Sequence, residues 1–143
     1  MNSVLALRVA AILTFIHAAL HTVGGVFGKT PPGPASLVLQ TMKATPIHVL
    51  GVTRTFWEFY HGMGLGVSIS LTAESIVIWQ LASLAKTMAP QLRPVLATFL
   101  VAYLGLAINS YFYFFAGPVI AEILIAACFA WAIVAARPSA AIA

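Results

Sequence analysis

Two short segments of the sequence place histidine and glutamate at helical spacing. His17 and His21 are four residues apart, and Glu58 precedes His61 by three. Residues at these spacings lie on the same face of a helix. A neutral imidazole beside a carboxylate can act as a general acid/base pair. We therefore predict a catalytic site for acid/base chemistry formed by His17, His21, Glu58 and His61.

The same four residues are also the alternative ligand set for a metal ion. A Glu-x-x-His segment on a bundle helix is one half of the di-iron carboxylate pattern, but the sequence has no second copy of it. The two helix-spaced histidines lack the adjacent glutamate of the zinc-protease motif. We predict no cofactor. A mononuclear metal site or a haem, bound by His17, His21, Glu58 and His61, is the alternative.

Further polar residues are predicted at the same depth in the membrane. At about 1.5 Å per residue, Asn109 and Glu122 lie roughly 9 and 6 Å from the ends of their apolar segments, and Tyr60 and Tyr113 could add hydroxyl donors. Ionisable groups in hydrocarbon are costly and usually face a bundle interior. We expect four of these residues to bind substrate: Tyr60, Asn109, Tyr113 and Glu122.

Purely structural roles are the alternative for the acidic residues. Glu58 could pair with Arg54 at the membrane surface, and Glu122 could stabilise the first turn of its helix through the helix dipole. Glu74 is nearly on the opposite helical face from Glu58, and the sequence leaves its role open between an oligomer contact and a second polar site.

The composition of the chain is far more apolar than that of a soluble protein. Of 143 residues, 62% are hydrophobic and only 7% charged, whereas soluble domains have about 25% charged residues. The net charge is +4, but the seven basic residues are scattered, which argues against nucleic-acid binding. The single cysteine, Cys128, excludes an internal disulfide. The composition indicates an integral membrane protein.

Four apolar segments are long enough to cross a bilayer as helices. They cover residues 4–27, 54–81, 95–115 and 119–136. We predict an all-α fold, a four-transmembrane-helix bundle with up-down-up-down topology, in one domain covering residues 1–143. The first loop, residues 28–53, is long and rich in proline, and its length suits a lid. A short interfacial helix is expected at residues 35–43, and Gly62 and Gly66 form a small face for close helix packing.

Loop charges set the expected orientation. One side carries four basic residues against three on the other, which favours cytoplasmic termini. The four are Arg8, Lys86, Arg93 and Arg137, and the three are Lys29, Lys43 and Arg54.

Three stretches carry a resemblance to known proteins. They are residues 17–25, His-Ala-Ala-Leu-His-Thr-Val-Gly-Gly, residues 54–62, Arg-Thr-Phe-Trp-Glu-Phe-Tyr-His-Gly, and the proline-rich first loop. The chain resembles an uncharacterised group of small bacterial four-helix membrane proteins, and its layout is similar to the DoxX-like proteins. The resemblance implies a bacterial inner-membrane location and assigns no activity.

These observations lead to three functional hypotheses. The first is a membrane-embedded enzyme that isomerises, cyclises or opens the epoxide of a lipophilic small molecule by acid/base chemistry. The second is a non-catalytic subunit that binds a metal, haem or quinone, or that stabilises a larger membrane complex. The third is a proton-coupled transporter, which would require a homo-oligomer. The expected partners are the bilayer and a lipid or lipophilic small molecule, with no nucleic acid.

Overall fold

The computed structural model describes residues 2–136, which are mostly helical. Three helical segments are long and apolar enough to cross a membrane: Ser3–Val26, Phe56–Tyr113 and Ala116–Ala135. The predicted helical character is therefore confirmed. Arg137, which contributes to the charge comparison above, lies outside the described residues.

The first helical segment changes from α-helical to π-helical winding toward its end. Helix α1, Ser3–Leu20, continues into a π-helix, η1, His21–Val26. The amide of Phe27 donates to the carbonyl of Thr22, five residues earlier, at 3.0 Å. Single π-helical turns occur frequently at functional sites. In this chain the π-helix begins at one of the predicted catalytic histidines.

The connection after η1 contains two regular elements. The predicted short helix is present as α2, Pro34–Ala44, with a proline in its first turn. An antiparallel hairpin follows, formed by β1, Pro46–Val49, and β2, Val52–Thr55.

The hairpin was not predicted: it occupies the end of the predicted first loop, residues 28–53, and the first two residues of the predicted span that begins at about residue 54. The turn residues Leu50 and Gly51 both have positive φ, 48° and 81°, as a type I′ turn requires. The β-branched residues on both sides of this turn, Val49 and Val52, favour strands over helix.

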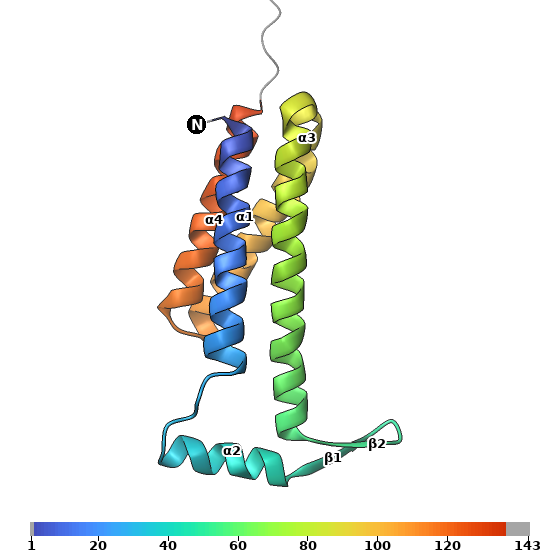
Figure 1. The fold of residues 1–143 in the computed structure, drawn as a ribbon, viewed down its shortest axis with the longest axis vertical. Helices are drawn as coiled ribbons and strands as arrows, with labels where there is room; N and C mark the ends of the chain where they lie inside the picture. The colour runs from blue at the N-terminus through green and yellow to red at the C-terminus, as the bar shows by residue number, and fades with distance from the viewer. Residues whose placement is uncertain (1, 137–143) are drawn as a thin grey trace, which may run out of the picture. The chain divides into compact units, whose positions relative to one another are not determined.

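Helix α3, Phe56–Tyr113, contains a kink where the sequence predicted a loop. Only Met88 leaves the helical region, with φ −132° and ψ 32°, and the chain reverses direction there (Figure 1). The residues between the second and third predicted spans, 82–94, are therefore mostly helical. Pro90 is tolerated because it lies in the first turn after the kink, where amides have no intrahelical acceptor. Helix α4, Ala116–Ala135, follows a short turn.

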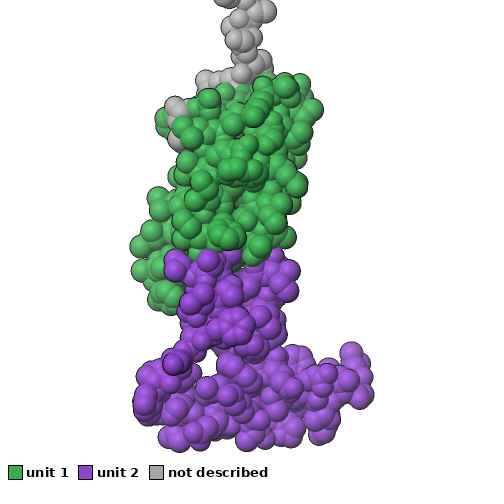
Figure 2. Space-filling view, in the orientation of Figure 1, with its two compact units in different colours: residues 1–17, 71–143 green, residues 18–70 purple. Residues whose placement is uncertain are grey.

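The chain divides into two compact units, which Figure 2 shows in different colours. Unit 1 comprises residues 1–17 and 71–143, and unit 2 comprises residues 18–70. In unit 1, buried side chains from α1, both arms of α3, and α4 form one core. The ring of Phe129 in α4 stacks on Phe99 and Tyr103 of α3, with centroid distances of 5.2 and 5.8 Å.

Candidate functional site

In unit 2, residues 21–27 face the first turns of α3, and two of the predicted histidines, His21 and His61, belong to these two segments. On α3, His61, Gly64 and Ser68 recur at helical spacing and share one face. The rings of Phe27 and His61 meet edge to face, 5.8 Å apart. The Thr22 hydroxyl donates to Ser68 at 2.8 Å.

Gly64 lies between these two contacts. A methyl group on Gly64 would lie only 3.2 Å from a Val26 methyl, so glycine allows the two segments to approach closely. Gly62 and Gly66, which we expected to serve this purpose, have no described heavy atom within 4 Å of the Cβ position outside their own local backbone.

His21 is held in one orientation by the backbone of α3. Its Nε2 lies 3.1 Å from the carbonyl oxygen of Gly64. A carbonyl can only accept a hydrogen bond, so Nε2 must carry the proton. The Nδ1 atom faces Gly25, where a Cβ would lie only 3.4 Å away. This hydrogen bond holds the ring of His21 in one orientation, with Nδ1 toward Gly25.

His61 is half-buried among aromatic rings. Trp57 lies 5.2 Å from it, ring centroid to ring centroid, at an interplanar angle of 30°, and Phe27 contacts its edge. The ammonium of Lys43 lies 5.2 Å from the Trp57 ring centroid. Among the described residues, the buried Nδ1 of His61 has no hydrogen-bond partner. This contact set therefore leaves one buried polar atom of His61 unsatisfied among the described residues.

Glu58 caps the helix on which His61 lies. Its carboxylate accepts a hydrogen bond from the amide of Thr55 at 2.6 Å, and its own amide donates to the Thr55 hydroxyl at 3.1 Å. This reciprocal arrangement is a capping box. The Arg54 guanidinium donates to the carbonyl of Thr53. Glu58 is exposed, and its described contacts give it a structural role.

The remaining predicted site residues lie in different environments. His17 belongs to unit 1 and is half-buried. Tyr60 and Tyr113 are 55% and 77% exposed, and Asn109 is also exposed. Within residues 2–136, no group of three or more histidine, cysteine, aspartate or glutamate side chains is placed to hold a metal ion. The four-residue site therefore stays a prediction. Of its members, His21 and His61 lie on the two segments that face each other in unit 2.

The structure also shows a polar chain inside unit 1 that sequence reasoning missed. The Tyr103 hydroxyl donates to the carboxylate of Glu74 at 2.9 Å and lies 3.2 Å from the Thr14 hydroxyl. Tyr103 and Thr14 are completely buried. No local pattern links these residues, because Thr14 and Tyr103 are 89 positions apart. This chain gives Glu74 a defined partner in the interior.

Glu122 is buried at the start of α4, with only 4% of its surface exposed. One carboxylate oxygen accepts a hydrogen bond from the Ser110 hydroxyl at 3.0 Å. The second oxygen is buried and has no hydrogen-bond partner among the described residues. An incompletely satisfied carboxylate is costly to bury. Its place in the core therefore lowers the stability of unit 1.

We expect Glu122→Leu combined with Ser110→Ala, which also removes the buried hydroxyl that would lose its acceptor, to raise the free energy of unfolding by about 1–3 kcal/mol, the usual cost of a buried polar group that lacks a partner. Thermal unfolding in detergent, followed by circular dichroism, measures this change. Glu74→Leu is the matched control and should lower stability, because it leaves the Tyr103 hydroxyl without its acceptor. Equal destabilisation by both substitutions would contradict the account of Glu122.

Comparisons of the chain with known protein families, curated proteins and solved structures found no significant match.

Proposed function

We propose that the protein is an integral membrane protein that crosses the bilayer four times, with alternating direction. The support comes from α1, the two arms of α3, and α4, whose exposed faces are as apolar as their buried ones. Exposed side chains on these helices include Ile12, Ile69, Val101 and Val134, each at least half exposed. Helices that are hydrophobic on all sides require a lipid or protein environment.

The proposed topology places the kink at Met88 on one side of a bacterial inner membrane and α2 on the other. Cysteine introduced at Lys43 and at Met88, in a Cys128→Ser background, should react with an impermeant maleimide from opposite sides. Both termini should report from the same side as Met88, which the loop charges place in the cytoplasm. Labelling of residues 43 and 88 from the same side would rule out this arrangement.

Within this framework the proposed function is isomerisation of a lipophilic small molecule, with His61 as the proton-transferring group. The observation that favours it is the buried Nδ1 of His61, which has no described hydrogen-bond partner and lies between aromatic rings. An isomerisation removes a proton from one carbon and returns it to another, so that no proton is gained or lost overall. Its chemistry therefore needs one base that also serves as the acid.

His21 suits a supporting role in the same reaction. Its Nε2 lies 3.1 Å from the Gly64 carbonyl oxygen, which holds the ring in one orientation. In the neutral form of the ring, Nδ1 would accept a hydrogen bond and orient a hydroxyl group or a water molecule in the site. Cyclisation, like isomerisation, would return the proton that it removes. Epoxide opening would instead add a water molecule to a ring carbon, with one proton passing from that water to the base and one proton taken up by the oxygen released from the ring.

The activity can be tested with two lipophilic probes in lipid nanodiscs. A long-chain β,γ-unsaturated ketone reports isomerisation through the ultraviolet absorbance of its conjugated product. A long-chain terminal epoxide reports ring opening by gas chromatography. We expect one of the two to be converted faster than in empty nanodiscs. Binding of both probes without conversion of either would instead favour the alternative, a non-catalytic binding subunit.

A further inference from the structure

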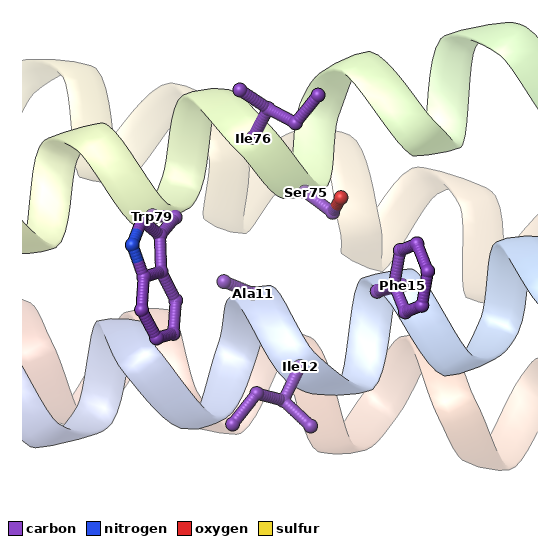
Figure 3. Close-up of a pocket in the computed structure, with 6 residues that line it drawn as sticks. All are labelled: Ala11, Ile12, Phe15, Ser75, Ile76 and Trp79. Carbon is purple, nitrogen blue, oxygen red and sulfur yellow. The ribbon is translucent and has the colours of Figure 1, made fainter.

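An apolar groove runs between α1 and α3 within unit 1 (Figure 3). Its volume is about 330 Å³, at the lower end of the range for small-molecule sites. The rings of Phe15 and Trp79 stand at its two ends, and the small side chain of Ala11 lies between them. Ile12, Ile76 and Ser75 complete the lining.

A positive charge is fixed at the Trp79 end of the groove. The guanidinium carbon of Arg8 lies 3.6 Å from the Trp79 ring centroid, a close cation–π contact. One Arg8 nitrogen donates to the Ser83 hydroxyl at 3.2 Å. A guanidinium has five N–H donors in a rigid fork, a geometry that matches phosphate oxygens.

The two helices bordering the groove change from apolar to basic in the same direction. On α1 the groove-facing stripe runs from Phe15 through Ile12 and Ala11 to Arg8, at helical spacing. On α3 the matching stripe runs from Ile76 through Trp79 and Ser83 to the exposed Lys86. Arg8 lies five residues, about 8 Å, from the start of α1. This depth suits a basic side chain that reaches the headgroup level.

From this arrangement we infer that the groove binds one acyl chain of an anionic phospholipid, whose phosphate is held by Arg8 and Lys86. The apolar part of the groove would take the chain, and the basic end would complement the charge of the headgroup. The carboxylates of unit 1 do not compete for these cations, because Glu74 and Glu122 accept hydrogen bonds from Tyr103 and Ser110. The site shares only the membrane insertion with the proposed function and is independent of His61.

Trp79 provides a readout specific to this groove. Phenylalanine at Trp57 and Trp131 leaves Trp79 as the sole tryptophan of the three in the sequence. The full chain in detergent micelles would be titrated with phosphatidylglycerol or phosphatidylcholine carrying identical brominated acyl chains, which quench tryptophan fluorescence. Phosphatidylglycerol should half-quench Trp79 at about 30-fold lower mole fraction, the effect expected of two basic residues at a membrane surface, at about 1 kcal/mol each.

Variants separate the headgroup contact from the acyl contact. Arg8→Gln should lower the preference for phosphatidylglycerol about fivefold and the double variant Arg8→Gln, Lys86→Gln should abolish it, whereas Arg93→Gln, beyond the Met88 kink, should change it less than twofold. Ile76→Phe fills the groove from its exposed rim and should weaken quenching by both lipids, as should Ala11→Leu at its floor. Free glycerol phosphate should not displace the lipid.

Three outcomes would overturn the assignment. Equal quenching by both lipids would show that Trp79 contacts only the non-specific lipid around the helices. An equal effect of the Arg8 and Arg93 substitutions would remove the local headgroup site. Displacement by glycerol phosphate would reduce the site to one for a free anion.

Discussion

The His61→Phe variant is expected to fold normally and to convert the responsive lipophilic probe 10²–10⁴ times more slowly than the wild type. A positioned general acid/base typically contributes a factor of this size. Phenylalanine preserves the planar ring between Trp57 and Phe27 but has no nitrogen to accept a proton. The loss should appear mainly in kcat, because the group acts on the transition state rather than on substrate binding.

His48→Phe is the matched control for this loss. His48 is exposed on the hairpin and hydrogen-bonds to Thr53 across it at 2.9 Å, so its replacement should leave the rate unchanged. Initial rates in nanodiscs, with circular dichroism to confirm folding, measure the effect. A folded His61→Phe protein with a wild-type rate would remove His61 from the mechanism. Equal losses from both substitutions would point to a general perturbation instead.

The largest expected effect on stability comes from Gly28→Ala. Gly28 follows the π-helix, and a methyl group at this position would overlap the carbonyl oxygen of Gly24. Since both clashing groups belong to the backbone, the chain itself would have to move rather than a side chain. We expect a loss of about 3 kcal/mol, at the upper end of the ordinary range for single substitutions.

Gly24→Ala tests the same chemical change within the π-helix. No described heavy atom outside the local helical backbone lies within 4 Å of its Cβ position, and alanine favours helical structure over glycine. Its stability should therefore equal or exceed that of the wild type. Thermal unfolding in detergent compares the two variants. If Gly28→Ala were as stable as Gly24→Ala, the close approach at Gly28 would make no contribution to the free energy of unfolding.

Local patterns along the sequence predicted the helical character of this chain. Each long segment contains an 18-residue stretch of high mean hydropathy, and proline and glycine lie near the observed ends. The capping box was also readable locally, because Thr55-x-x-Glu58 has its signature spacing. We instead assigned Glu58 to the catalytic site, since helical spacing alone does not distinguish a cap from an acid/base group.

Other features depended on contacts that no local pattern contains. The pairing of Glu74 with Tyr103 spans 29 positions, and that of His21 with Gly64 spans 43. Such pairs form only when helices pack at a particular rotation and depth, which side-chain volumes at the interface determine. The kink at Met88 is likewise a tertiary outcome, because packing on both arms of α3 keeps residues helical that proline spacing alone assigns to a loop. The sequence thus determined which segments are helices and which residues are available for chemistry, and the tertiary structure decided which of those residues meet.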